Sequence, residues 1–254
     1  MTYVHTLNQV KAVLGIQQSL GSRRLQYDAD FHRERDTWWE SNLDVYNTHP
    51  DGLKVEHGEA SGRINFNMES GEFIQTFKDS KSDAFKANLD GFETFFGRAR
   101  NVGYTINGTS GNNYISTSDS RDFVDGGKGH DQIWTGKGDD IIRAGSGVDY
   151  VFSGDGRDAI ITKQDRGFAL ICDFEIGQDR LLIDGGMRNV NIKNHRDADF
   201  DSYREDLLSG ISAWGPNLEN SLINASMVFK GNDLVAVITS TEASDLSIVG
   251  SQIM

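Results

Sequence analysis

The sequence predicts an α+β N-terminal domain (residues 1–104), an all-β parallel β-roll (105–165) and a β-rich C-terminal cap (166–254). Three observations lead to this prediction. A nine-residue repeat fills residues 108–161 without a break in phase. Apolar residues at helical spacing flank a hairpin pattern before the repeat, and strand-like runs joined by glycine turns follow it.

The first hundred residues combine helical and strand periodicities. A capping-box sequence at Thr6 opens an apolar stripe that predicts a helix to about Ser19. A hairpin is predicted next, turning at 69–71, with apolar residues alternating along both strands: Ile64, Phe66, Met68, Phe73 and Phe77. Ser82 then caps a second predicted helix, whose apolar face reads Phe85, Leu89, Phe92 and Phe96. That face is interpreted as core, with a partner-binding face as the alternative.

Aromatic and titratable residues outside the repeat offer few candidates for a site. Trp38 and Trp39 are interpreted as core or interface packing, with a ligand platform as the alternative. His32 and His49 have no metal ligands at a matching spacing, so they are expected at the surface. Cys172 is the only cysteine, which excludes an intramolecular disulfide, and its apolar neighbours indicate a buried, unreactive thiol.

Residues 108–161 consist of six nonads: GTSGNNYIS, TSDSRDFVD, GGKGHDQIW, TGKGDDIIR, AGSGVDYVF and SGDGRDAII. Glycines in the first half of a nonad let the backbone turn through positive φ at little steric cost. The last three residues form a short strand, whose middle side chain is always apolar and points inward. A single nonad cannot bury that side chain, so the nonads must stack.

Position six of the nonads predicts two columns of oxygen ligands. If successive turns alternate sides, two nonads complete one coil; the first column is then Asn113, Asp131 and Asp149, and the second column is Asp122, Asp140 and Asp158. Carboxylates roughly 4.8 Å apart repel by on the order of 3 kcal/mol per pair at an effective dielectric of ~20. Carboxylates with turn carbonyls form a flexible oxygen cage that suits Ca²⁺ better than Mg²⁺. A glycine- and aspartate-rich turn without metal is the alternative.

The nonads resemble the calcium-binding repeats of the RTX (repeats-in-toxin) family, which includes secreted bacterial proteases, lipases, haemolysins and surface proteins. The resemblance implies a calcium-loaded parallel β-roll, with ions held between turns by the position-six Asp and by carbonyls at positions two and four. It carries over to these residues: Gly127, Gly129, Asp131, Gly136, Gly138, Asp140, Gly145, Gly147, Asp149, Gly154, Gly156 and Asp158. The first two nonads depart from the pattern, because Asn113 is neutral and no glycine precedes Asp122, so partial sites are expected there.

The region after the repeat predicts a closing segment. Residues 162–170 drift out of pattern, with Gly167 where an aspartate is expected. Residues 173–183, DFEIGQDRLLI, resemble the segment that closes the β-roll in RTX proteins. A short helix is predicted at 200–208 and a hairpin turning at 230–233. That hairpin resembles the tails of RTX proteins exported by type I secretion.

Several functional classes are disfavoured. There is no H-E-x-x-H or G-x-S-x-G motif, which argues against the zinc-protease and lipase branches of the family. The net charge of −13 argues against nucleic acid as a partner. The N-terminus lacks the pattern of a signal peptide and no stretch approaches a transmembrane length, so export by a non-Sec, type I-like route is expected.

These patterns together predict a non-enzymatic, calcium-dependent protein, secreted or at the cell surface, with a structural or adhesive role. Its roll is expected to fold on Ca²⁺ and to offer strand edges for self-assembly into a calcium-dependent oligomer or filament. One alternative is a secreted enzyme with an active site in residues 1–104, where the repeats would serve secretion and stability. A ligand-binding module that uses Trp38 and Trp39 is a further alternative.

Overall fold

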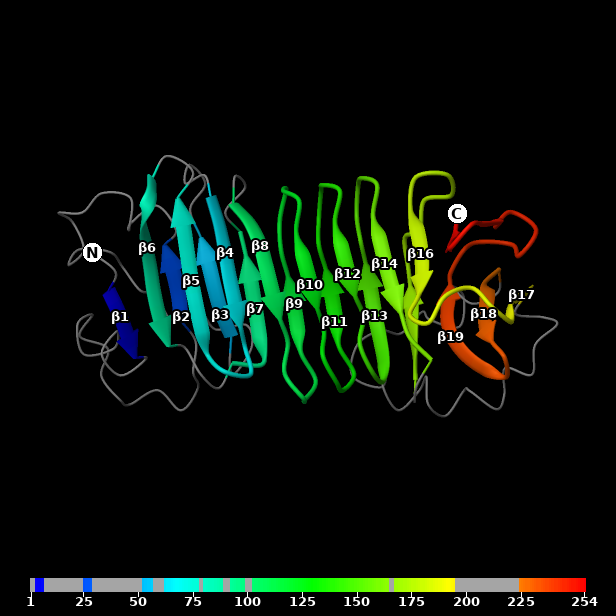
Figure 1. Cartoon of the computed structure of the whole chain (residues 1–254), viewed down its shortest axis with the longest axis horizontal. Coiled ribbons are helices and arrows are strands. Elements are labelled where there is room, and N and C mark those ends of the chain that lie inside the picture. Colours follow the sequence, from blue (N-terminus) through cyan, green and yellow to red (C-terminus); the bar gives the residue numbers. More distant parts are fainter. Residues whose placement is uncertain are drawn as a thin grey trace.

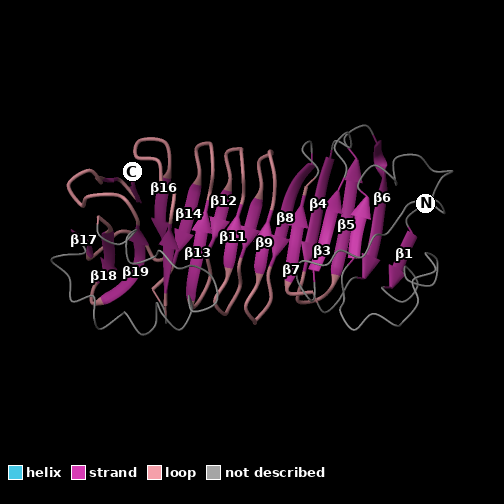
Figure 2. Ribbon diagram, turned by 180° about the vertical axis from the view of Figure 1, so that it is seen from behind, coloured by secondary structure: helices cyan, strands magenta, loops and turns pink. Residues whose placement is uncertain are grey.

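The computed structural model describes residues 3–6, 25–28, 52–56, 62–77, 80–88, 92–98, 102–164, 167–194 and 224–254. Every regular element in these ranges is a β-strand. The strands form one sheet of eleven strands and one of ten, stacked along a single long axis (Figures 1 and 2). Apolar side chains from both sheets form a core cluster that extends from Ile64 to Ile253.

The centre of the stack is a regular roll of short parallel strands. The ten-stranded sheet contains β9 (Tyr114–Ser116), β11 (Gln132–Trp134) and β13 (Val148–Phe152). The eleven-stranded sheet contains β10 (Phe123–Asp125), β12 (Ile141–Arg143) and β14 (Ala159–Thr162). Every strand pairs with the strand two nonads later, for example Ile133 with Val151. The predicted coil of two nonads is confirmed.

Position-eight side chains form the spine of the roll. All six are fully buried: Ile115, Val124, Ile133, Ile142, Val151 and Ile160. Full burial of a valine or isoleucine contributes roughly 1.5–3 kcal/mol. Since each side chain is covered by those of neighbouring coils, this contribution exists only when the coils are stacked.

Aromatic side chains also stack on the outer face of the ten-stranded sheet. The ring centroids of Tyr114 and Trp134 lie 4.8 Å apart, and those of Trp134 and Phe152 lie 5.4 Å apart with planes inclined by only 4°. Phe96 extends the row by packing 5.1 Å from Tyr114. Because the rings cover one another's faces, the row acts as a cross-strand ladder that supports the parallel register.

Both sheets continue from the roll towards the N-terminus. β8 (Val102–Asn107) pairs in parallel with β10 and with β4 (Gly62–Asn67), so it crosses the boundary predicted at residue 104 without a break. β7 (Thr94–Gly97) pairs likewise with β9 and with β3 (Gly52–Glu56). The predicted α+β character is therefore not found in the described part of residues 1–104, which extends the stack instead.

The predicted hairpin at residues 64–77 is confirmed. β4 pairs antiparallel with β5 (Glu72–Phe77), placing Phe66 opposite Phe73, and both rings are fully buried. β6 (Ser80–Asn88) adds to the outer side of β5, and β1 (Tyr3–Thr6) adds to β6. In the other sheet, β2 (Leu25–Asp28) pairs with β3.

The helix predicted from Ser82 to Phe96 is wrong. That stretch contains β6 and β7 instead, and Phe95 is buried where the helical stripe required Phe96. Phenylalanine fits a pleated surface well, and pairing of β7 with strands on both sides outweighs a stripe of four aromatic residues. Other predictions lie outside the described residues: the helix at 7–19, the helix at 200–208, Trp38, Trp39, His32 and His49.

The stack closes with longer strands after the last nonad. β15 (Phe168–Ile171) and β16 (Arg180–Ile183) add to β13 and β14 as one more coil. The predicted hairpin turning at 230–233 is confirmed as β18 (Ser226–Lys230) and β19 (Asp233–Ile238); β19 lies beside β15, and β17 (Val190–Asn194) beside β18. β21 (Gln252–Ile253) joins β16 to β20 (Ile248–Val249).

The cysteine that follows β15 is only partly exposed. Cys172 packs beside a cluster of buried apolar residues from β15, β18 and β19. Burial raises the pKa of its thiol to about 12, so the thiol is protonated at neutral pH. This agrees with the unreactive thiol expected from its apolar neighbours.

Candidate metal centre

The position-six side chains lie in two columns, one on each edge of the roll, as their spacing predicted. In the first column, the backbone N–H of Asn113 donates to Oδ1 of Asp131 (2.8 Å) and that of Asp131 to Oδ1 of Asp149 (3.0 Å). In the second column, the N–H of Asp122 donates to Asp140 and that of Asp140 to Asp158, both at 2.8 Å. One oxygen of each accepting carboxylate therefore fixes the preceding coil.

In four of the column aspartates, the other carboxylate oxygen has no partner among the described residues. Among the described residues, no donor reaches the buried Oδ2 atoms of Asp122, Asp131, Asp140 and Asp158. The nearby hydroxyls of Thr117 and Thr135 donate to backbone carbonyls one coil further on, at 3.0 and 2.8 Å. Buried polar atoms are rarely left unpaired in proteins. Four in regular positions indicate that these sites are built for a cation.

Burial makes these carboxylates weak acids in the structure without a cation. It raises the pKa of Asp131 to about 9, with the neighbouring Asp149 charge adding to the effect. The pKa is raised by burial to about 8 for Asp122, about 7 for Asp158 and about 6 for Asp140. A bound cation would reverse this shift, because it stabilises the ionised carboxylate.

The glycines at positions two and four bring successive turns into close backbone contact. A β-carbon on Gly147 would lie 2.0 Å from the carbonyl oxygen of Gly129, and one on Gly156 would lie 1.9 Å from that of Gly138. Gly147 also has φ of 117°, which side-chain-bearing residues rarely adopt. Glycine is thus required because carbonyl oxygens project into the space where a β-carbon would stand.

The composition of the turns selects the kind of metal. Within the described residues, no group of three or more His, Cys, Asp or Glu side chains is arranged to hold an ion. An ion between the turns would take its ligands from backbone carbonyls and from the column carboxylates. A flexible, all-oxygen set of this kind suits Ca²⁺ and does not suit Zn²⁺.

The structure adds a carboxylate at the entrance of the first column. Glu93 immediately precedes β7, as Asn113 precedes β9, and its Oε2 accepts hydrogen bonds from Asn113 Nδ2 (2.5 Å) and Thr109 Oγ1 (2.7 Å). Asn113 is thus paired with a carboxylate outside the repeat. Nothing in the local sequence marks Glu93, because it does not belong to a nonad.

The second column also continues beyond the repeat. The backbone N–H of Asp158 donates to Oδ1 of Asp179 (3.0 Å), which is fully buried. Asp173 closes the same edge by accepting the N–H groups of Ser153 (3.0 Å) and Gly154 (2.9 Å). Sequence reasoning missed the roles of Asp173 and Asp179, because both lie outside the regular repeat. The step from Asp158 to Asp179, for example, is 21 residues, whereas the regular step is 18.

The first column ends one coil earlier, at Asp149. The sequence placed Gly167 at an aspartate position, and the structure corrects this. Gly167 stacks on Gly147 and so occupies position four. Ala169 pairs with Asp149 and so stands where the next aspartate would lie. The two edges of the roll therefore differ at their exit.

Comparison with known families agrees with this geometry. A family model of the RTX calcium-binding nonapeptide repeat (4 copies) matches residues 105–133 and 129–160. Residues 105–160 are RTX calcium-binding nonapeptide repeats. The RTX match covers roughly a fifth of the chain and contains both columns. A search of curated proteins found no match.

RTX calcium-binding repeats are typical of secreted proteins. In the described part of the chain, no helix is long and apolar enough to cross a membrane.

Proposed function

We propose that this protein is a non-enzymatic structural or adhesive component, secreted or at the cell surface, whose RTX roll folds when Ca²⁺ binds between its turns. The observation that carries this proposal is the set of buried, unpaired Oδ2 atoms in both columns. Each is an oxygen ligand held in place without a partner, beside turns whose carbonyls also face the gap.

The proposed ligands follow the columns. The first edge would use Asp131 and Asp149 with carbonyls of the turns that contain Gly127, Gly129, Gly145 and Gly147. The second edge would use Asp122, Asp140 and Asp158 with carbonyls of the turns that contain Gly136, Gly138, Gly154 and Gly156. Bound Ca²⁺ would supply positive charge that neutralises the carboxylates and ties one coil to the next. Asp179, which continues the column at the exit, has both carboxylate oxygens hydrogen-bonded to backbone N–H groups, those of Asp158 and Glu175, and is not among the proposed ligands.

Calcium concentration would then decide when the roll folds. Extracellular modules bind Ca²⁺ with Kd of ~10⁻⁴–10⁻³ M, far above cytosolic calcium. Because an ion that binds only the folded state stabilises it, external calcium would fold the roll and cytosolic calcium would leave it exportable.

A calcium titration followed by far-UV circular dichroism tests this proposal. We expect a cooperative gain of β signal in the range of ~10⁻⁴–10⁻³ M Ca²⁺, with no such gain in Mg²⁺. The Asp131→Ala/Asp149→Ala variant should lose most of the response, since both carboxylates of the first edge are gone. A spectrum that is already folded in chelator and indifferent to calcium would refute the proposal.

Self-association is the part of the proposal that concerns the ends of the stack. β20 is the last strand of the eleven-stranded sheet within the described residues, and its Ile248 and Val249 are 46% and 53% exposed. A short edge strand with exposed apolar side chains is a site for pairing with another chain. Contact between this end and the opposite end of a second copy would be heterologous and would build filaments.

Sedimentation velocity at about 5 mM Ca²⁺, above the ~10⁻⁴–10⁻³ M Kd of extracellular modules, tests the contact. Wild-type protein should form species larger than a monomer, and Ile248→Lys should shift them to monomer. Ile176→Lys is a matched control, because Ile176 is also 46% exposed but lies in the turn before β16. A wild-type monomer under these conditions would exclude self-assembly while leaving the calcium-dependent roll standing.

A further inference from the structure

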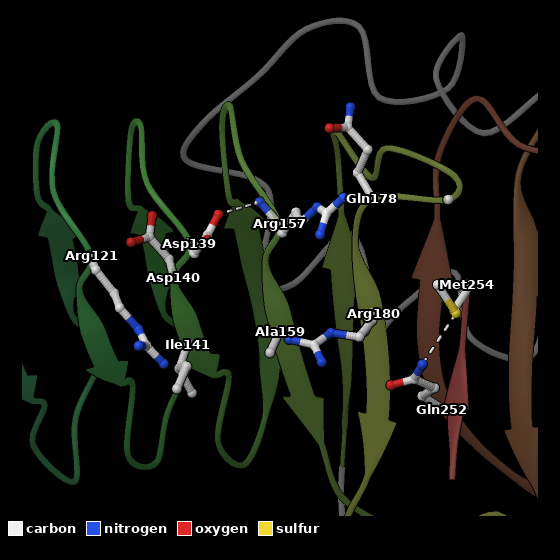
Figure 3. Close-up of a pocket in the computed structure, with 11 residues that line it drawn as sticks. Arg121, Asp139, Asp140, Ile141, Arg157, Ala159, Gln178, Arg180, Gln252 and Met254 are labelled. Atoms are coloured by element: carbon white, nitrogen blue, oxygen red, sulfur yellow. Dashed lines mark hydrogen bonds between the residues drawn. The ribbon is translucent and has the colours of Figure 1, made fainter. Parts of the chain in front are cut away.

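A groove runs along the outer face of the eleven-stranded sheet, beside the second edge of the roll. It has a volume of about 540 Å³, and its floor is formed by Ile141 of β12 and Ala159 of β14. Three arginines lie around it: Arg121 in the turn before β10, Arg157 in the turn before β14, and Arg180 at the start of β16. Figure 3 shows Arg121 and Arg180 extending towards each other from either side of the two floor residues.

The three arginines are exposed, and Arg121 lies close enough to the buried Asp140, which also lines the groove, to interact with its charge. Among the described residues, none of them forms an ion pair, although the chain as a whole has a net charge of −13. The neighbouring Arg143 of β12 is different, since it faces Asp125 at 3.7 Å and Asp184 at 4.0 Å. Asp139, the exposed carboxylate in the groove, accepts the backbone N–H of Arg157 instead (3.1 Å).

We propose that this groove binds an acidic oligosaccharide, that is, a glycan segment carrying at least two sulfate or carboxylate groups. Guanidinium is the side chain best suited to planar, bidentate contact with such oxyanions. The amides of Gln178 and Gln252 line the same groove and offer donors and acceptors for hydroxyl groups. The apolar floor suits the C–H face of a sugar ring.

The size of the groove favours a ligand with several anionic groups over a single ion. Arg121 leads into β10 and Arg180 lies on β16, three strand spacings apart in the sheet, or roughly 14 Å between backbones. A single inorganic anion can reach only part of that span. The floor strands β12 and β14 are hydrogen-bonded on both sides, so an acidic peptide could not bind by adding a strand.

Isothermal titration calorimetry at saturating Ca²⁺ tests the proposal with three probes: a sulfated hexasaccharide, its unsulfated parent, and inorganic sulfate. We expect binding of the sulfated hexasaccharide alone, weakening as salt rises because the contacts are ionic. Equal affinity for inorganic sulfate would reduce the groove to a free-ion site and overturn the proposal. Binding of the unsulfated parent at equal strength would also overturn it.

Variants locate the binding on the groove. Arg121→Gln/Arg180→Gln should weaken hexasaccharide binding tenfold or more, and Arg157→Gln alone should weaken it less. Arg188→Gln is the matched control, because Arg188 is exposed, carries the same charge and lies outside the groove. Unchanged affinity in the double variant, or an equal loss in Arg188→Gln, would overturn the proposal.

Glycan binding by the groove and calcium-dependent folding of the roll can be tested separately on the same protein samples. No side-chain hydrogen bond of Arg121 or Arg180 to another described residue holds the sheet, so the double variant should keep the wild-type circular dichroism response to calcium. Lost glycan binding with an intact calcium response would support the groove. If the wild-type protein binds the glycan but its circular dichroism spectrum does not respond to calcium, the calcium proposal is refuted and the groove proposal stands.

Discussion

At the scale of single residues, four column aspartates, Asp122, Asp131, Asp140 and Asp158, each have two carboxylate oxygens with different roles. Oδ1 of Asp131 accepts the N–H of Asn113 and fixes the neighbouring coil, whereas Oδ2 is buried without a partner. The same division holds for Asp140 and Asp158 in the second column. An asparagine can keep the first role, because its amide oxygen accepts a hydrogen bond, but it cannot supply the charge of the second.

Asp131→Asn should therefore have opposite effects with and without calcium. Calcium affinity should fall by roughly tenfold or more, because a charged ligand is lost. In calcium-free buffer the folding equilibrium should shift towards the roll, because a costly buried carboxylate is removed. Calcium titration, and the far-UV circular dichroism signal in calcium-depleted buffer, measure the two effects. Asp245→Asn, an exposed site outside the roll, is the charge-matched control, and an equal effect there would contradict the prediction.

Gly147→Ala should destabilise the calcium-saturated roll strongly. Its β-carbon would lie 2.0 Å from the Gly129 carbonyl oxygen, and its φ of 117° is unfavourable for alanine. Left-handed strain and overpacking together predict a loss of roughly 2–5 kcal/mol. Gly231→Ala separates the two causes, because Gly231 has φ of 65° but nothing within 4 Å of a β-carbon. Equal losses of free energy of unfolding in both variants would show that the close approach is unimportant.

At the scale of the element, a turn and its strand form a unit that is stable only when it is stacked. The strand buries one large apolar side chain, and the turn places an aspartate and carbonyls against the next turn. Stacking therefore buries carboxylates together with apolar side chains. Burial of the carboxylates opposes folding, and burial of the apolar side chains favours it. Only the contribution of the carboxylates changes with pH.

The calcium-free roll should accordingly become more stable as pH falls. The folded-state pKa is about 9 for Asp131 and about 8 for Asp122, both above the ordinary value of 3.8. The folded state thus binds more protons than the unfolded state between these values, so stability is greatest near pH 4 and is lost as pH rises through about 6 to 9. Far-UV circular dichroism in calcium-depleted buffer at several pH values measures this, and the β signal should grow as pH falls towards 4. Stability that rises with pH over this interval would contradict it.

At the scale of the whole molecule, the repeat is one section of two continuous sheets. β8 hydrogen-bonds β10 on one side and β4 on the other, and β15 links the roll to β19. The core cluster likewise extends from Ile64 to Ile253. Order in the roll and order in the flanking coils are therefore coupled through shared hydrogen bonds and shared core.

Removal of calcium should expose amides well outside the repeat. Hydrogen exchange in chelator should accelerate in β4 and β8 as well as in β10 and β12, because β8 loses its partner when the roll unfolds. Hydrogen exchange followed by mass spectrometry, with and without Ca²⁺, resolves these segments. Unchanged protection of β4 in chelator would show that the N-terminal strands fold independently.

The sequence by itself determined the central roll: its coil length, its inward spine, its two columns and its family. It could do so because a nonad encodes its own turn and strand, and the repeat supplies the neighbours in constant register. Hairpins such as that between Phe66 and Phe73 were also readable, since both strands and their turn are local.

Only the tertiary structure decided what lies at irregular separations. The helical stripe at 82–96 became strands because β7 has hydrogen-bonding partners on both sides, β3 and β9. Glu93 and Asp179 joined the columns through coils that break the regular period. Arg121 and Arg180 line one groove for the same reason: sheet pairing sets the distance between them, and local sequence carries no record of it.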